Sequence, residues 1–88
     1  MNNNNTKTVH VGFNNSVIAK KIIAVINSDS NPSKRLIADA RTSGRLIDAT
    51  EGRRTRAVIV MDGGYAVLSA LMPETLIARV EGSSDGEE

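Results

Sequence analysis

Two apolar runs separated by three turn-forming residues constrain the fold of this chain more than any other feature. The runs are Ala57–Met61 and Tyr65–Ala70, and Asp62-Gly63-Gly64 lies between them. Aliphatic runs joined by such a turn are typical of a β-hairpin, because glycine readily adopts the positive φ angles that tight hairpin turns need. We therefore expect these two segments to pair as antiparallel strands in the C-terminal half of the chain.

Three further segments are predicted to be strands. Thr8–Phe13 alternates apolar and polar residues, which predicts a half-buried strand with Phe13 facing the core, and Asn14-Asn15-Ser16 is predicted to be the turn after it. Ile22–Ile26 is a continuous and mostly β-branched run, which favours a strand buried on both faces. Leu46-Ile47 is predicted to be a short strand.

Two segments, at about residues 32–43 and 73–80, are predicted to be helices. In the first, Asn31 suits the N-cap, Pro32 the first helical position and Gly44 the position after the last turn. Its apolar positions recur at helical spacing and are Leu36, Ile37 and Ala40. Pro73 and Glu74 suit the start of the second helix. The predicted fold class is therefore α+β, with a small, mostly antiparallel sheet and two helices.

Composition divides the chain into a foldable centre and two polar ends. Residues 1–7 are rich in asparagine, and residues 81–88 form an acidic Gly/Ser tail, so neither end can bury apolar surface and we expect both to be disordered. The single domain that remains, residues 8–80, is so small that one core is marginal, and the 88 residues include no cysteine for a disulfide. Self-association is expected for this reason.

The sequence offers little to catalysis. Its only histidine, His10, lies on the predicted polar face of the first strand, and no His, Asp and Glu residues occur at metal-ligand spacing. Asp48 and Glu51 are expected to be local partners of Arg53 or Arg54. We predict a non-enzyme with no catalytic residues, metal or cofactor. Without an apolar run of membrane length or a signal-type segment, we expect a cytoplasmic protein with no membrane partner.

Fixed positive charge is concentrated in Gly52-Arg53-Arg54-Thr55-Arg56. If this segment is extended, Arg54 and Arg56 share a face and Arg53 points away. Residues 1–80 contain eleven lysines and arginines but six acids, a formal charge of +5, whereas residues 81–88 carry −4. Not every base in the body can be paired with an acid, and guanidinium groups match phosphate geometry. The segment therefore predicts an anion site.

The phosphate backbone of duplex DNA is the partner that fits this site best. Binders of single-stranded RNA or DNA usually stack bases on aromatic platforms, and this chain has only Phe13 and Tyr65. Three alternatives stay open: an RNA- or ribosome-associated protein, a sensor of a phosphorylated small ligand held by the same arginines, and an oligomer that binds no ligand.

The chain resembles the RemA family of small bacterial regulators of extracellular-matrix genes, over roughly residues 8–80. The matching stretches are Val11-Gly12-Phe13 with Asn15, Ile22-Ile23-Ala24, Pro32 with Lys34-Arg35-Leu36-Ile37, Asp39-Ala40-Arg41, Leu46-Ile47-Asp48-Ala49-Thr50, Gly52-Arg53-Arg54-Thr55-Arg56-Ala57-Val58-Ile59, Met61-Asp62, Leu68-Ser69-Ala70 and Pro73-Glu74-Thr75. The sequence is therefore identified as a candidate member of that family.

This resemblance implies a nucleoid-associated DNA-binding regulator, typically an activator of biofilm-matrix genes, whose dimers assemble into an octameric ring with DNA on the basic outer surface. The family's DNA-contacting arginines correspond to Arg53 and Arg54. A third family arginine is replaced here by Lys21, and lysine makes a bidentate contact less well than arginine does. A tyrosine typical of the family is replaced by Glu51. The residues expected to contact DNA are Arg53, Arg54, Lys21, Arg56, Lys20, Lys34 and Arg35.

Overall fold

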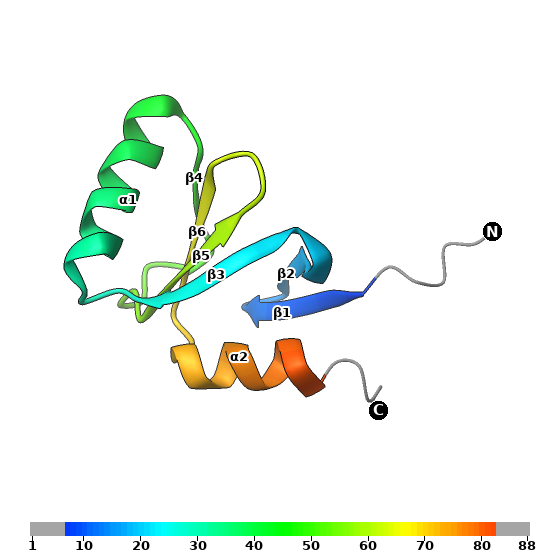
Figure 1. Cartoon of the computed structure of the whole chain (residues 1–88). Coiled ribbons are helices and arrows are strands. Elements are labelled where there is room, and N and C mark those ends of the chain that lie inside the picture. Colours follow the sequence, from blue (N-terminus) through cyan, green and yellow to red (C-terminus); the bar gives the residue numbers. More distant parts are fainter. Residues whose placement is uncertain (1–6, 83–88) are drawn as a thin grey trace.

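The structure is a computed structural model in which residues 7–82 are described (Figure 1). The expected disorder of residues 1–6 and 83–88 lies outside the described residues. In chain order, the elements are β1 (Thr8–Gly12), β2 (Asn15–Ile18), the 3-10 helix η2 (Ala19–Lys21), β3 (Ile22–Asn27), α1 (Asn31–Ser43), β4 (Leu46–Asp48), β5 (Ala57–Met61), β6 (Tyr65–Ser69) and α2 (Pro73–Gly82). The predicted α+β class is confirmed.

The strands form two sheets. β1 and β2 pair as an antiparallel hairpin, and the other four strands form a sheet in the order β3-β5-β6-β4. Within the larger sheet β3, β5 and β6 are antiparallel neighbours, whereas β4 runs parallel to β6. α1 connects edge strand β3 to edge strand β4 at the opposite side of the sheet, as expected for a helical crossover.

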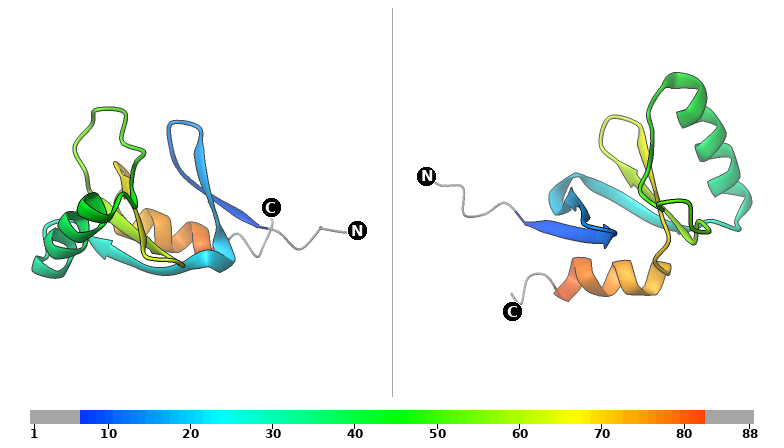
Figure 2. Two further views of the ribbon diagram at one scale, coloured as in Figure 1. Left: turned by 90° about the horizontal axis from the view of Figure 1, so that it is seen from above. Right: turned by 180° about the vertical axis from the view of Figure 1, so that it is seen from behind.

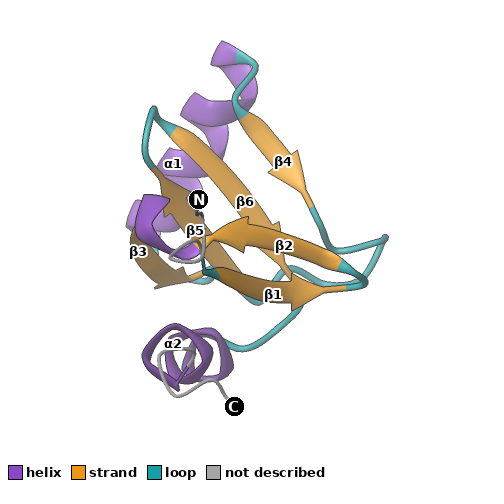
Figure 3. Ribbon diagram, turned by 90° about the vertical axis from the view of Figure 1, so that its right-hand side faces the viewer, coloured by secondary structure: helices purple, strands orange, loops and turns teal. Residues whose placement is uncertain are grey.

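The larger sheet is the middle layer of the molecule. On one face, Ala40 of α1 packs against Val58, Ala66 and Leu68 of the sheet. On the other face, a second apolar cluster joins the sheet to β1 and α2, and it consists of Val11, Ala49, Ala57, Ile59, Met61, Val67 and Leu76. Figures 2 and 3 show α1 on one side of this sheet and the β1–β2 hairpin with α2 on the other. Strands β5 and β6 are the two inner strands of this sheet, and each contributes residues to both clusters.

The hairpin expected from Asp62-Gly63-Gly64 is confirmed. Ala57 pairs with Ser69 and Met61 pairs with Tyr65, and both glycines have positive φ angles. The strands buried on both faces are β5 and β6, however, and not Ile22–Ile26 as predicted. β3 is an edge strand with a register shift between Ile22 and Ala24, and the side chain at this irregularity, Ile23, is 66% exposed.

Two predictions about the N-terminal segment are wrong. Residues Asn15–Ile18 form strand β2, so the turn between the first two strands is Phe13-Asn14 rather than residues 14–16. Both turn residues have positive φ, 53° and 66°, as the type I′ hairpin turn requires. Phe13 is therefore carried to the tip of the hairpin, where it is 46% exposed instead of facing the core.

Both helices are confirmed with corrected ends. The N-cap of α1 is Ser30 and not Asn31, because the Ser30 side chain accepts a hydrogen bond from the backbone N–H of Ser33. Gly44 ends the helix in the left-handed conformation, as predicted. α2 continues through residues 81 and 82, which the sequence analysis had assigned to the disordered tail.

Candidate nucleic-acid interface

The loop between β4 and β5 contains a tight turn, residues 50–53, directly before the arginines. The backbone N–H of Arg53 donates to the carbonyl of Thr50 at 2.9 Å, and the two residues between them, Glu51 and Gly52, have φ angles of 53° and 80°. Positive φ at both central positions is the signature of a type I′ turn. Glycine accepts this conformation freely, whereas a glutamate is strained in it.

Asp48 and Thr50 fix the start of this turn. One carboxylate oxygen of Asp48 accepts from the Thr50 hydroxyl at 2.6 Å and from the Thr50 backbone N–H at 2.9 Å. These two bonds, the hydroxyl bond first, hold the pKa of the Asp48 carboxyl below its usual value because they favour the charged form. Asp48 is thus a partner of Thr50, and the prediction that it pairs with Arg53 or Arg54 is wrong.

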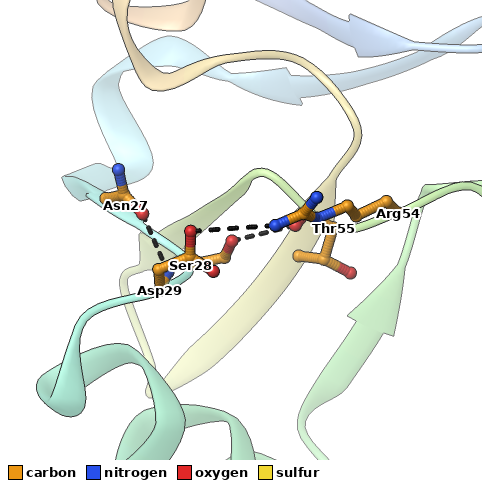
Figure 4. Close-up of polar contacts among 5 residues, drawn as sticks. All are labelled: Asn27, Ser28, Asp29, Arg54 and Thr55. Atoms are coloured by element: carbon orange, nitrogen blue, oxygen red, sulfur yellow. Dashed lines mark hydrogen bonds and ion pairs between the residues drawn. The ribbon is translucent and has the colours of Figure 1, made fainter.

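Hydrogen bonds to main-chain atoms also hold the far end of the arginine segment. The Ser28 hydroxyl donates to the carbonyl of Thr55 at 2.8 Å (Figure 4). The Ser28 N–H donates to the carbonyl of Arg56 at 3.2 Å. On the opposite side, the N–H of Arg56 donates to the carbonyl of Ser69 at 2.8 Å. The main chain of the arginine segment is therefore fixed between the ends of β3 and β6, while its charged side chains remain at the surface.

All three arginines line one surface hollow, which we call the arginine hollow. Its volume is about 360 Å³, and it is lined by Phe13, Arg53, Arg54, Arg56, Ala70 and Leu71. Residues 53–56 are not a strand, so the alternation on which the separation of Arg53 from the other two was predicted does not apply. The guanidinium of Arg53 lies over the Phe13 ring, 5.8 Å from its centroid.

Acids neutralise little of this charge. Arg54 Nη2 lies 3.9 Å from Asp29 Oδ2, and both side chains are exposed (Figure 4). An exposed ion pair at this distance contributes roughly 0–1 kcal/mol, so a stronger anion can displace it. Within residues 7–82, Arg53 and Arg56 have no carboxylate within ion-pair distance. The hollow is thus lined by three arginines, of which Arg54 alone has a carboxylate within ion-pair distance among residues 7–82.

The structure places Lys34 and Arg35 at the same end of the sheet as the arginine hollow. Both are exposed in the first turns of α1, which begins directly after the loop containing Ser28 and Asp29. That loop is the one bonded to Thr55 and to Arg54. Within the described chain neither Lys34 nor Arg35 has an acidic partner. These two bases extend the positive surface around the hollow.

Lys20 and Lys21 are not brought to the hollow. They lie in η2, at the start of β3, where the Lys21 carbonyl accepts from the N–H of Asp62 and Lys21 Nζ is 3.9 Å from Asp62 Oδ2. The arginine segment pairs with the other end of β3, and six residues of strand separate the two ends. At about 3.3 Å per residue, this separation is roughly 20 Å. One subunit therefore presents two basic groups at opposite ends of its sheet.

Phe13 and Asp29 are the site residues that the sequence analysis missed. Figure 3 shows the turn between β1 and β2 beside the loop that follows β4, which places Phe13 against the arginines. The available signal was the apolar pair Val17-Ile18 after the polar turn, since it marks a return strand and hence an exposed hairpin tip. No local pattern indicates the contact between Asp29 and Arg54, because it depends on the pairing of β3 with β5.

Other kinds of site are poorly represented in the described part of the chain. Residues 7–82 contain no group of three or more His, Cys, Asp or Glu side chains that could hold a metal ion. Neither of the helices found there is long and apolar enough to span a bilayer.

Comparison with known proteins finds similar sequences along most of the chain. The RemA-like family, described as extracellular matrix regulatory protein A-like, matches residues 8–80. A protein of Dictyoglomus thermophilum, named "Putative regulatory protein", is 55% identical over 82 residues, 93% of this chain and 96% of that protein. A similar protein of Geobacillus kaustophilus is 51% identical over 93% of this chain and 94% of that protein. Another, of Synechococcus sp., is 51% identical over 84% of this chain and 83% of that protein.

The family match spans nearly the whole of the described fold, including both sheets, both helices and the arginine hollow. This chain belongs to the RemA-like family of regulatory proteins.

Proposed function

We propose that this regulatory protein binds duplex DNA by holding backbone phosphates in the arginine hollow. The observation that carries the proposal is the convergence of Arg53, Arg54 and Arg56 on one hollow with a single weak acidic partner. The surrounding main chain is already fixed by hydrogen bonds to Ser28 and Ser69. Little conformational freedom of the backbone is then lost on binding, which favours affinity.

The charge of the folded body suits a polyanion. Residues 1–80 have a formal charge of +5, and the bases around the hollow add Lys34 and Arg35 to the three arginines. Each phosphate neutralised by a protein cation releases counterions and adds about 0.9 to the slope of log K against log salt. Contacts of this kind position a protein on DNA without reading bases. The proposed mode is therefore binding through backbone charge and DNA deformability.

The proposed biological role is regulation of transcription, with activation of extracellular-matrix and biofilm genes and association with the nucleoid. The description of the family supports the matrix connection, and the names of the relatives support the regulatory role. DNA binding is the physical means by which a domain of this size, with an exposed basic surface, can exert such regulation.

We further propose that the protein acts as a homo-oligomer, in which dimers build an octameric ring. Edge strand β3 exposes Ile23, and Ile77 of α2, which lines the same surface hollow as Ile23, is 41% exposed. Apolar side chains gathered at a sheet edge are a common means of association. Repetition of the arginine hollow around a ring would multiply phosphate contacts, since linked sites gain effective concentration.

A second candidate is binding of RNA or another single strand, and the exposure of Phe13 beside the arginines favours it. Duplex DNA remains the better proposal because residues 7–82 offer one ring at this site, and one face of that ring already carries Arg53. A comparison of duplex DNA, single-stranded DNA and RNA of equal length at matched salt decides between the two.

The test is a salt titration of duplex-DNA binding with the intact protein and with Arg53→Ala/Arg54→Ala. We expect the intact protein to bind with a steep salt slope, and the variant to lose affinity with a slope smaller by about 2, one for each phosphate contact removed. The molar mass of both proteins is measured by light scattering. The control Arg41→Ala/Arg45→Ala removes two charges from the opposite end of α1 and should keep most of the affinity.

Two results would contradict the proposal. One is intact protein that binds duplex DNA no better than the Arg53/Arg54 variant at every salt concentration. The other is a variant whose subunits dissociate, because the arginines would then hold the assembly together instead of binding phosphate.

A further inference from the structure

Phe13 occupies a position that the fold alone does not favour for a phenylalanine. It is the first residue of the two-residue turn between β1 and β2, with a φ of 53°. A bulky side chain with positive φ is a conformational outlier that lowers the stability of the fold. Asparagine or glycine would satisfy this type I′ turn without that cost. Turn geometry therefore does not explain why a phenylalanine stands here.

Core packing does not explain it either. The side chain is 46% exposed at the hairpin tip, whereas the neighbouring strand residues Val9 and Val11 are 2% and 1% exposed. Phe13 is also absent from both hydrophobic clusters of the fold. An exposed and conformationally strained aromatic residue is a reason to look for function at that position.

The surroundings of Phe13 indicate what that function is. Its ring lines the arginine hollow, together with the apolar side chains of Ala70 and Leu71. Arg53 lies over the ring, 5.8 Å from its centroid. One wall of the hollow is thus cationic and another is apolar, and the two walls meet at Phe13 and Arg53.

A nucleic-acid backbone has the same alternation of chemistry. Each phosphate is flanked by sugars, whose carbon atoms are the least polar part of the backbone. In a duplex the faces of the bases are stacked on one another, and only their edges are reachable in the grooves. A hollow with guanidinium groups beside an aromatic wall can hold a phosphate against the first and a sugar against the second.

We propose that Phe13 is a DNA-contacting residue whose ring packs on the deoxyribose next to the phosphate held by Arg53, Arg54 and Arg56. This inference rests on the proposed DNA binding. The contact is apolar and neutralises no phosphate. It therefore strengthens binding without changing the number of counterions released.

The experiment compares Phe13→Gly and Phe13→Asn with the intact protein and with Arg53→Ala. Both Phe13 variants suit a φ of 53°, so we expect an unchanged or higher melting temperature and an unchanged molar mass. We expect their affinity for duplex DNA to fall by roughly tenfold, which is in the range of a lost aromatic contact at an interface. We expect the salt slope of both variants to equal that of the intact protein. Arg53→Ala should instead lower the slope by about 1. Phe13→Tyr keeps the ring and should retain affinity.

Three outcomes would overturn the inference while DNA binding itself stands. The first is that Phe13→Gly binds duplex DNA as tightly as the intact protein. The second is a loss of slope equal to that of Arg53→Ala, which would mean that Phe13 only positions Arg53. The third is a loss confined to single-stranded DNA or RNA, which would assign the ring to base stacking. Failure of the proposed function is distinct, since the intact protein would then show no salt-dependent duplex binding.

Discussion

Glu51 is the least suitable residue in the turn between Thr50 and Arg53. Glu51 has a φ of 53° in the turn that precedes Arg53, and it places a negative charge two residues before the first of the three arginines. We expect Glu51→Asn to raise the free energy of unfolding by about 0.5–1 kcal/mol, because asparagine tolerates the left-handed conformation better. It should also tighten DNA binding, because the repulsion of phosphate is removed.

Glu51→Gln separates these two effects, since it removes the charge and leaves the backbone strain. We expect this variant to share the gain in affinity but not the gain in stability. Urea unfolding and a DNA titration at fixed salt measure the two quantities. If Glu51→Asn and Glu51→Gln proved equally stable, the strain assigned to the turn would not exist.

The Asp48–Thr50 pair gives the same turn a dependence on pH. Hydrogen bonds from Thr50 lower the pKa of the Asp48 carboxyl, so its charged form stabilises the fold above the usual carboxyl pKa. This stabilisation is lost as the pH falls through the lowered value, below about pH 4. Asp48→Asn should therefore be less stable than the intact protein at pH 7, by less than about 1 kcal/mol because the carboxylate is exposed.

The measurement is urea unfolding of both proteins between pH 7 and pH 2.5, and the stability difference should shrink toward the acid end. Asp39→Asn serves as the control, since Asp39 is an exposed residue of α1 to which no hydrogen bond or ion pair is assigned within residues 7–82. An Asp48→Asn difference that stayed constant over this range would show that the Thr50 bonds do not depend on the carboxylate charge.

At the scale of elements, sequence patterns correctly predicted features set by neighbouring residues. They failed for features set by which strands pair with one another. The Asp62-Gly63-Gly64 turn and the Gly44 cap gave the β5–β6 hairpin and the end of α1, since turn and cap chemistry act over a few residues. Strand β2 was missed because Asn15 and Ser16 look like turn residues, and only pairing with β1 makes them strand. The exposure of β3 was missed because edge and central strands differ in their neighbours, not in their composition.

The candidate site divides in the same way. The three arginines were found because their charge is visible in any conformation. The hollow that they line, the partner Asp29 and the neighbouring Phe13 were not found, since each depends on which strand ends meet in space. Lys20 and Lys21 were grouped with the arginines by charge, although β3 holds them at its other end.

The N-terminus of α1 provides a direct test of one corrected assignment. Ser30 Oγ accepts from the N–H of Ser33 at 3.2 Å, whereas Asn31 is the first residue of the helix. We expect Ser30→Ala to lower the free energy of unfolding by about 1 kcal/mol, the usual cost of losing an N-cap. Asn31→Ala should change it by less than about 0.5 kcal/mol. Thermal or urea unfolding of the two variants compares them, and the reverse ranking would restore Asn31 as the cap.

At the scale of the whole molecule, assembly through the exposed edge strand would decide how the two basic ends of the sheet are combined. A single subunit places the arginine hollow and the Lys20–Lys21 pair at opposite ends of β3, so a polyanion that contacts both must follow the length of the sheet. An assembly changes this, because the hollow of one subunit can lie near the lysines of the next. The affinity of the proposed DNA complex should therefore depend on residues that touch no DNA.

Ile23 is the residue on which this dependence can be measured. It is the most exposed of the large apolar side chains in the described chain, at 66%, and it lies on the longer edge strand of the sheet. We expect Ile23→Ser to lower the molar mass of the protein in solution and to weaken DNA binding, because avidity is lost while every arginine remains. The free energy of unfolding of the subunit itself should change little, since the side chain is exposed.

Ile47→Ser is the matched control. Ile47 is 49% exposed on β4, the opposite edge strand, which is only three residues long and offers less backbone for pairing. Light scattering over a range of protein concentrations gives the mass of both variants, and a titration at fixed salt gives their affinity. If Ile23→Ser kept the mass of the intact protein while Ile47→Ser lowered it, β4 would be the associating edge. If neither variant changed mass or affinity, association through a sheet edge would be wrong, and the arginine hollow of each subunit would act alone.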